Sequence, residues 1–238
     1  MEGFSRNWKD PSYELPPGDV LIHLSESSVA SEVTEETKAL NLLKLQKILS
    51  SGYRRIIYAS SGVIYGDSQS TPHKETDVPA ASSPYARSKV EAEALVLGAG
   101  GVALRLGNVY GPYPKKQTVL EAIVSQMKAS KSEITLLNQS AVRDYVWVED
   151  AAECFIEAAL RSDVSGIFNV GSGTGTSVTQ IVEKLSVLTR KKLLIVESSP
   201  LNKPSELILD TEKASGVLNW RATTSLETGL KKLWENSL

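Results

Sequence analysis

The chain has 238 residues, 41% of them hydrophobic and 23% charged, and a net charge of −2. Such a composition is ordinary for a globular protein with a large core, and it offers no basic surface for nucleic acid. The sequence contains no run of about 18 apolar residues, so no membrane span is predicted. The polar N-terminal segment lacks the apolar centre of a signal peptide. The lone Cys154 gives neither a disulfide framework nor zinc-ligand spacing, so no metal site is expected. These features predict a cytoplasmic protein that binds neither nucleic acid nor membrane.

Short apolar runs alternate with longer helical patterns, which is typical of βα units arranged around a parallel sheet. In chain order we predict strands at 20–24, 55–59, 102–106, 134–137, 145–148, 167–170 and 193–196. The helical patterns cover 32–49, 85–97, 119–127, 151–160 and 181–188, with a short helix after 210 and a final one after 224. We expect the first three strands to form a main sheet with helices on both faces. The strands at 134–137, 167–170 and 193–196 are expected to build a smaller C-terminal α/β lobe.

Polar residues mark the expected starts of three helices. Asp150 stands where it would cap the helix 151–160. Ser177 with Gln180 forms a capping box before 181–188, and Thr224 with Glu227 forms another before the last helix.

Tyr85 and Lys89 lie four positions apart on a predicted helix and therefore share one face. A free phenol has a pKa of about 10, and a nearby ammonium group favours the phenolate, as a general acid/base requires. Ser60 and Ser61 follow the strand at 55–59, so a hydroxyl there could bind the same substrate oxygen. Tyrosine and lysine also occur at this spacing by chance, but the upstream serine pair favours a catalytic set.

Several segments in order resemble the extended short-chain dehydrogenases/reductases of the NAD-dependent epimerase/dehydratase group. The segment SSGVIYG at 60–66 is similar to the catalytic-serine strand end of that family, and PYARSK at 84–89 to its catalytic helix. The later landmarks are RLGNVYGP at 105–112, RDYVWVEDAA at 143–152, FNVGSG at 168–173 and LDTEKASGVLNW at 209–220. The resemblance implies a Rossmann-like parallel sheet. It further implies a dinucleotide-binding-type domain over 1–112, to which 143–171 partly returns, and a substrate-binding lobe over most of 113–238.

The resemblance assigns roles to individual residues. It implies that Tyr85 is the acid/base, that Lys89 lowers its pKa, and that Ser61 binds the sugar oxygen. Tyr85, Lys89 and Ser60 would contact NAD or NADP.

Two further residues fall where this family contacts the sugar and diphosphate of a nucleotide-sugar: Asn108 and Arg143. An arginine suits a diphosphate because its planar fork pairs with phosphate oxygens. The alternative for Arg143 is a salt bridge to Asp144 or Glu149, and the alternative for Asn108 is a turn position before Tyr-Gly-Pro.

The positions after the catalytic hydroxyl narrow the expected chemistry. Dehydratases and decarboxylases of this family carry carboxylates there, whereas this chain has Gly62 and Val63. That difference favours epimerisation or ketone reduction at a sugar.

The glycine-rich turn that normally receives the cofactor pyrophosphate does not precede Val20. We therefore expect a front portion of on the order of 60 residues to be absent and NAD to bind weakly to this chain alone, whereas a nucleotide diphosphate still binds. GSGTGTS at 171–177 mimics a phosphate loop, but the resemblance puts it at the edge of the substrate region. The strand at 20–24 would then form a sheet edge, covered by the N-terminal 17 residues, a partner chain or a second copy.

Three hypotheses for the function follow from these features. The chain is an NAD(P)-dependent nucleotide-sugar epimerase or ketoreductase, a non-catalytic nucleotide-sugar-binding module, or a truncated or split enzyme that needs a partner chain to bind NAD.

Overall fold

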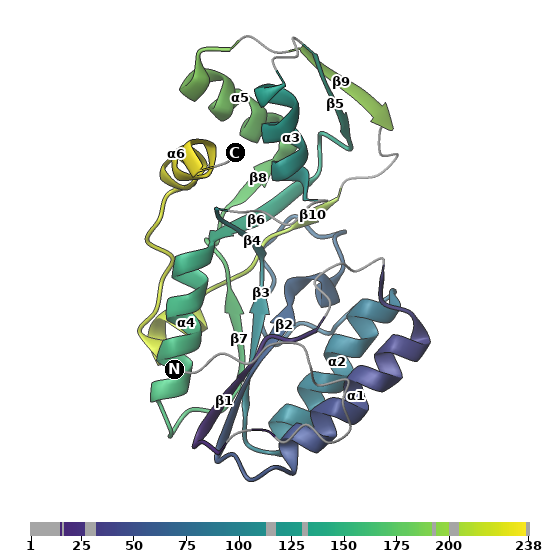
Figure 1. Ribbon diagram of the computed structural model, residues 1–238, viewed down its shortest axis with the longest axis vertical. Coiled ribbons are helices and arrows are strands. Elements are labelled where there is room, and N and C mark those ends of the chain that lie inside the picture. Colours follow the sequence, from purple (N-terminus) through teal and green to yellow (C-terminus); the bar gives the residue numbers. More distant parts are fainter. Residues whose placement is uncertain are drawn as a thin grey trace.

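The main sheet consists of four parallel strands, as the computed structural model shows (Figure 1). The structure describes residues 15, 17–26, 32–112, 118–129, 133–191, 194–199 and 205–236. The strands run in the order β1 (Val20–His23), β2 (Arg55–Ser61), β3 (Val102–Leu106) and β7 (Gly166–Val170). Each pair is parallel, with Ile22 opposite Ile57 in the first. The α/β fold expected from the alternating pattern is thus confirmed.

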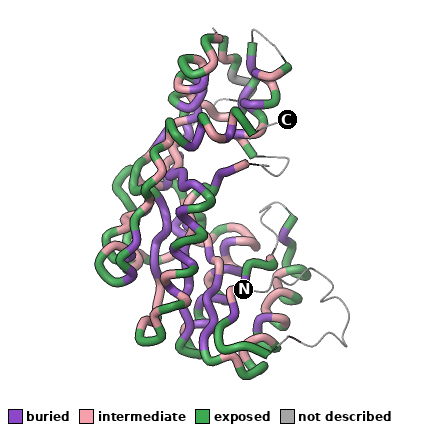
Figure 2. Tube along the Cα trace, turned by 60° about the vertical axis from the view of Figure 1, so that its left-hand side comes forward, coloured by how far each residue is buried: buried purple, intermediate pink, exposed green. Residues whose placement is uncertain are grey.

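Helices cover both faces of this sheet, with α1 (Glu35–Leu49) and α2 (Pro84–Gly98) on one face and α4 (Val148–Leu160) on the other (Figure 1). Buried strands of a parallel sheet carry apolar side chains in both directions, and β2 does so. Ile57 packs with Cys154 and Phe155 of α4, whereas the next residue, Tyr58, packs with the α1 and α2 side chains. Figure 2 shows the buried residues following the central strands.

The C-terminal lobe is smaller and has its own core of apolar side chains. Its strands are β4 (Asn108–Tyr110), β5 (Glu133–Leu137), β6 (Val142–Trp147), β8 (Gly175–Ser177), β9 (Leu194–Ser199) and β10 (Glu206–Leu207). Its helices are α3 (Val119–Lys128), α5 (Val178–Thr189) and α6 (Leu226–Asn236). β6 is paired in parallel with β4 and β10 and antiparallel with β8, and β5 pairs with β9. Two short helical segments, η3 (Gly62–Tyr65) and η4 (Ala214–Leu218), complete the elements. The division of the chain at residue 112 stays a prediction.

Three details of the expected fold are wrong. The strand at 167–170 belongs to the main sheet, where Leu104 of β3 pairs with Phe168. Asp150 does not cap α4, which begins earlier, at Val148; its carboxylate instead accepts hydrogen bonds from Thr223 and Thr224. Thr224 therefore does not cap α6, and Ser225 accepts the hydrogen bond from an amide of its first turn. The capping box of Ser177 with Gln180 is present as predicted.

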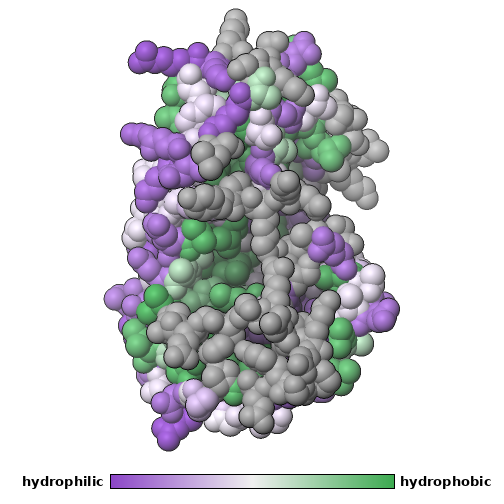
Figure 3. Space-filling view, in the orientation of Figure 1, coloured by the Kyte–Doolittle hydropathy of each residue, from purple (hydrophilic) through white to green (hydrophobic). Residues whose placement is uncertain are grey.

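The carboxyl ends of β1, β2 and β3 lie at one edge of the main sheet because these strands are parallel. Within the described residues β1 pairs only with β2, and the N-terminal segment expected to cover it lies almost entirely outside those residues. Ile156 and Leu160 of α4 are exposed. Figure 3 shows hydrophobic residues at the surface on the left of the molecule. None of the described helices is long and apolar enough to cross a membrane.

Candidate active site

Tyr85 lies in the first turn of α2, beside the carboxyl end of β2. The Ser83 hydroxyl caps this helix by accepting a hydrogen bond from the Ala86 amide (3.1 Å), and Pro84 occupies its first position, which fixes where the helix begins. Tyr85 is half-buried, and its hydroxyl makes no hydrogen bond to any residue of the described ranges. A phenol that is within reach of solvent and not engaged by the protein is available to a ligand.

Lys89 follows one turn later on the same face and is buried. Its Nζ lies 5.6 Å from the centroid of the Tyr85 ring and 4.8 Å from that of Tyr58. The ammonium donates to the carbonyl oxygen of Ala59 on β2 (2.8 Å) and to Oε2 of Glu26 (2.7 Å). The structure therefore brings Tyr85 and Lys89 together at the end of β2, as the four-residue spacing predicts.

Ser61 is the last residue of β2, two positions beyond Ala59. Its hydroxyl accepts a hydrogen bond from the Val63 amide (3.3 Å) and thereby caps η3. The side chain is only partly buried, so its O–H proton remains available to a ligand oxygen.

Glu26 lies three residues after the end of β1, and its carboxylate was not among the predicted site residues. Oε2 accepts hydrogen bonds from Lys89 and from the Tyr58 hydroxyl (2.8 Å), while Oε1 is buried and has no hydrogen-bond partner in the described part of the chain. His23 Nε2 lies 3.8 Å from Oε1, beyond hydrogen-bond distance. Burial alone would raise the pKa of Glu26, but His23, Lys89 and Tyr58 outweigh it and lower this pKa to about 2.

Tyr58 is a donor in this cluster rather than an acid/base. Burial, together with the Glu26 carboxylate, raises the pKa of Tyr58 well above its ordinary value. Its proton therefore stays on the phenol at neutral pH and holds Oε2 of Glu26.

Ser60, expected to contact the cofactor, points into a buried polar network. Its hydroxyl donates to Oε1 of Glu93 (2.5 Å), and Arg105 pairs with both oxygens of the same carboxylate (2.9 and 2.7 Å). Arg105 also donates to the Tyr65 hydroxyl (2.7 Å), which in turn donates to Oδ1 of Asn169. These bonds tie β2, α2, β3 and β7 together beneath the site, and the Ser60 hydroxyl is committed to them.

Arg143 lies on β6, at the other lobe. Its guanidinium donates to the carbonyl oxygen of Ser205 (2.9 Å), to the Ser205 hydroxyl (2.8 Å) and to Oδ2 of Asp67 (3.2 Å). Asp67 is thus its ionic partner, and not Asp144 or Glu149, the two partners that the sequence suggested. Its side chain is 23% exposed, so part of the guanidinium faces solvent.

Asn108, the first residue of β4, is exposed and lies opposite Tyr145 of β6. Burial raises the pKa of Tyr145 to about 12, even though Arg143 and Asn108 act in the opposite direction. Asn108 and Arg143 therefore flank the same tyrosine and lie on neighbouring strands.

The glycine-rich segment 171–177 binds a carboxylate of the protein itself. Asp144 accepts hydrogen bonds from the backbone amides of Ser172 (2.7 Å) and Gly173 (3.0 Å), and from the amide of Leu209 (3.3 Å). A side-chain carbon at Gly171 would lie 2.4 Å from Oδ2 of Asp144, so only glycine allows this close approach. Burial raises the pKa of Asp144 although these donors oppose the shift. Two amides of this segment, those of Ser172 and Gly173, are therefore occupied by Asp144.

Glu26 and Asp67 were missed because each acts through a partner far away in the sequence. One signal existed for Glu26: it follows β1, and parallel neighbouring strands deliver the residues after them to the same sheet edge as Ser61. No comparable signal pointed to Asp67, which pairs with Arg143 across the two lobes.

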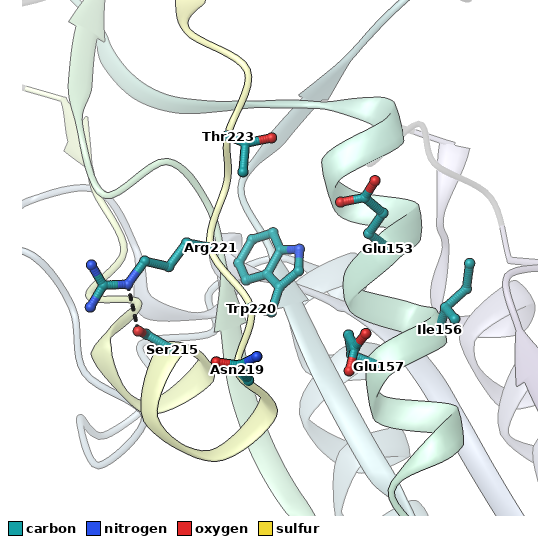
Figure 4. A pocket seen from close by; sticks show the side chains of 8 residues that line it. All are labelled: Glu153, Ile156, Glu157, Ser215, Asn219, Trp220, Arg221 and Thr223. Atoms are coloured by element: carbon teal, nitrogen blue, oxygen red, sulfur yellow. Dashed lines mark hydrogen bonds between the residues drawn. The ribbon is translucent and has the colours of Figure 1, made fainter.

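A surface pocket lies elsewhere, between α4 and the segment 215–223 (Figure 4). Glu153 and Glu157 of α4 line it together with Trp220, whereas the Arg221 side chain points away from α4 and donates to the Ser215 hydroxyl. None of the predicted site residues lines this pocket.

Comparisons with known proteins agree with this geometry. The model of the family described as "NAD dependent epimerase/dehydratase family" matches residues 17–171. A dTDP-4-dehydro-6-deoxyglucose reductase of Escherichia coli is 28% identical over 89% of this chain and 70% of its own length.

Two solved structures are similar over most of the chain. UDP-glucose 4-epimerase of Thermotoga maritima, crystallised with UDP-glucose, is 28% identical, with a TM-score of 0.81 over 92% of this chain and 76% of that one. UDP-glucose 4-epimerase of Thermus thermophilus, in complex with NAD, is 26% identical, with a TM-score of 0.81 over 92% of this chain and 77% of that one. The family match, which spans more than half of the chain, together with this fold establishes that the protein belongs to the NAD-dependent epimerase/dehydratase family.

Proposed function

We propose that the chain carries out NAD(P)-dependent epimerisation or ketone reduction on a nucleotide-linked sugar, with Tyr85 as the acid/base. The single observation that carries this proposal is the Tyr85 hydroxyl, which is half-buried, free of hydrogen bonds to the described residues, and set beside the Lys89 ammonium. A phenol that the protein leaves free in this position can take a proton from a sugar hydroxyl or return one to it.

The residues present fit one end of a nicotinamide cofactor. An ammonium group has three N–H donors. Lys89 donates two of them, to Ala59 and to Glu26, so one remains for a ribose hydroxyl. The amides of Ser172 and Gly173 do not fit the pyrophosphate end because Asp144 occupies them. When bound, the nicotinamide would accept a hydride from the sugar and return it.

The protein's own residues would orient the sugar. Ser61 would donate its O–H to the reacting sugar oxygen while Tyr85 takes or returns the proton. Gly62 and Val63 supply no carboxylate next to this oxygen. Elimination is not favoured because it would need such a second acid/base, whereas epimerisation and ketone reduction would not.

Asn108 and Arg143 would contact the diphosphate-linked part of the substrate. Arg143 is partly exposed and paired with Asp67, whose side chain is 54% exposed. An exposed ion pair contributes little stability, so a diphosphate can replace this carboxylate at low cost. The names of the relatives support a nucleoside diphosphate sugar as the substrate class.

The proposal is tested by incubating the protein with UDP-glucose plus NAD⁺, and with a dTDP-4-dehydro-6-deoxy sugar plus NADPH. Products are followed by NMR. We expect turnover of at least one substrate, and a loss of about 10²–10⁴-fold in kcat for Tyr85→Phe, the range typical for removing a general acid/base. Tyr53→Phe, just before the start of β2 at the opposite edge of the sheet, is the matched control and should retain full activity. Equal activity of Tyr85→Phe and wild type would refute the assigned role.

A second candidate is a nucleotide-sugar-binding module without catalysis. It is favoured by the internal pairing of both cations, Lys89 with Glu26 and Arg143 with Asp67. Binding of UDP-glucose without turnover under any of the conditions above would support this candidate.

A further inference from the structure

We propose that Glu26 is a cofactor-binding residue of this chain: together with Lys89 it forms a donor–acceptor pair that holds the two hydroxyls of the nicotinamide ribose. This inference rests on the proposed function, since it names a further residue of the same site. It concerns a residue that neither the family motifs nor the spacing of Tyr85 and Lys89 indicated.

Glu26 and Lys89 each keep hydrogen-bonding capacity that the described residues do not use. Glu26 Oε2 is occupied by two donors, whereas Oε1 of the same carboxylate is buried without a hydrogen-bond partner among the described residues. A buried charged oxygen left without a donor costs free energy. Lys89 in turn retains one N–H after its bonds to Glu26 and Ala59. One free acceptor and one free donor therefore lie next to each other.

The Glu26 and Lys89 side chains are also buried and held in place. The Glu26 side chain is 10% exposed and that of Lys89 is 6% exposed. Tyr58 holds Oε2, and Ala59 of β2 holds Nζ, so neither partner is free to swing away. A ligand would meet a preorganised site, which reduces the entropy lost on binding.

The Glu26–Lys89 pair is chemically complementary to a ribose diol. A vicinal diol presents hydroxyls that both donate and accept, so one hydroxyl can donate to Oε1 while accepting from Lys89. Carboxylates hold ribose diols in dinucleotide-binding folds for the same reason. An anionic group would be repelled by Glu26. The site therefore selects an uncharged diol, and Tyr85, on the same helix face as Lys89, lies beside it.

The test measures binding rather than turnover. NADH is titrated against the full chain and followed by saturation-transfer NMR, which detects even millimolar affinity. The variants are Glu26→Ala and Glu26→Gln, with Glu91→Gln as the matched control, because Glu91 is a glutamate of α2 that pairs with Lys38 at the surface. A second probe is an NADH analogue whose nicotinamide ribose lacks both hydroxyls, which tests wild-type protein without any substitution.

We expect Glu26→Ala to raise the dissociation constant of NADH about tenfold or more, the effect of losing a hydrogen bond to a charged group, and Glu91→Gln to leave it unchanged. The dideoxy analogue should bind wild type more weakly than NADH does, and the ratio of the two dissociation constants should be smaller in Glu26→Ala, where only Lys89 still contacts the ribose hydroxyls. NADH binding that is equal or tighter in Glu26→Ala, or equal binding of both ligands to wild type, would overturn the inference while leaving the proposed function intact. A wild-type chain that binds neither NADH nor NADPH would overturn both.

Discussion

The buried Asp144 carboxylate binds the backbone amides of the glycine-rich segment, which resembles a phosphate loop in sequence. The segment 171–177 has the glycine content of a phosphate loop, yet its amides donate to this carboxylate, as does the amide of Leu209. The glycines are therefore explained by contacts inside the protein.

We predict that Asp144→Ala lowers the free energy of unfolding by about 2 kcal/mol, because it leaves three backbone amides without their acceptor, of which that of Leu209 is buried. Asp144→Asn should cost less, since one oxygen remains. Urea unfolding followed by circular dichroism measures both changes. Glu212→Gln, a substitution of an exposed carboxylate beyond the same segment, is the control. A loss below about 0.5 kcal/mol for Asp144→Ala, the range of surface substitutions, would contradict this assignment.

At the level of residues, local spacing predicted the relation of Tyr85 to Lys89 because both lie on one helix. Spacing could not predict Glu26 or Asp67, whose partners are 63 and 76 positions away. Nor could it predict that the Ser60 hydroxyl is engaged by Glu93, because that depends on which way a strand residue faces.

Among the elements, β1 and α2 are joined at the site by one ion pair. Glu26 follows β1, Lys89 lies on α2, and the bond of Lys89 to Ala59 adds β2. On the outer side, exposed ion pairs of Lys38 with Glu91 and of Arg87 with Glu35 connect α1 to α2. The buried pair is the one whose protonation should influence stability.

We expect the contribution of Glu26 to stability to depend on pH. Its pKa is lowered from 4.5 to about 2 in the folded protein, so the ionised group stabilises the fold above pH 4.5 and the effect is lost as the pH falls towards 2. The shift corresponds to about 3 kcal/mol at most. The difference in unfolding free energy between wild type and Glu26→Gln should therefore be largest at pH 7 and less than half as large at pH 3. Glu91→Gln serves as the control, and a difference that does not change with pH would contradict the prediction.

Element types were predictable because hydrophobic periodicity and capping residues act locally. The start of α4 was misplaced because Asp150, a good capping residue by type, is used by Thr223 and Thr224 of a distant segment. The sheet partner of β7 was misassigned for a related reason: strand periodicity does not specify which strand lies alongside.

For the whole molecule, the two lobes meet at the carboxyl edge of the main sheet, and each lobe carries part of the proposed site. Lys89 and Tyr85 come from the sheet lobe, and Arg143 and Asn108 from strands of the C-terminal lobe. The family and the α/β fold followed from ordered motifs along the chain, whereas the pairing between lobes became visible only in three dimensions.

We predict that the chain alone binds NAD⁺ in the millimolar range or more weakly, and binds UDP more tightly. We propose two contacts for the ribose end of NAD⁺, whereas the amides of Ser172 and Gly173 are taken by Asp144 and do not receive its pyrophosphate. Each charge-assisted hydrogen bond that is missing costs about 1.5–3 kcal/mol. Calorimetric titration of NAD⁺ and UDP measures both affinities, with Arg143→Met as the variant expected to weaken UDP alone. Micromolar NAD⁺ binding would contradict the first half, and UDP binding that is unchanged in Arg143→Met the second.

The crowding around Asp144 also constrains how this sequence can diverge. A side-chain carbon at Gly107 would lie 2.8 Å from the Asp144 carbonyl oxygen, and one at Gly171 would lie 2.4 Å from its carboxylate. A smaller residue at 144 would relieve the crowding at Gly171, whose close contact is with the carboxylate, but not at Gly107, whose close contact is with the backbone carbonyl. Positions 144 and 171 therefore form a single evolutionary unit, in which the first accepted change must occur at the aspartate, whereas Gly107 stays fixed by the backbone of residue 144.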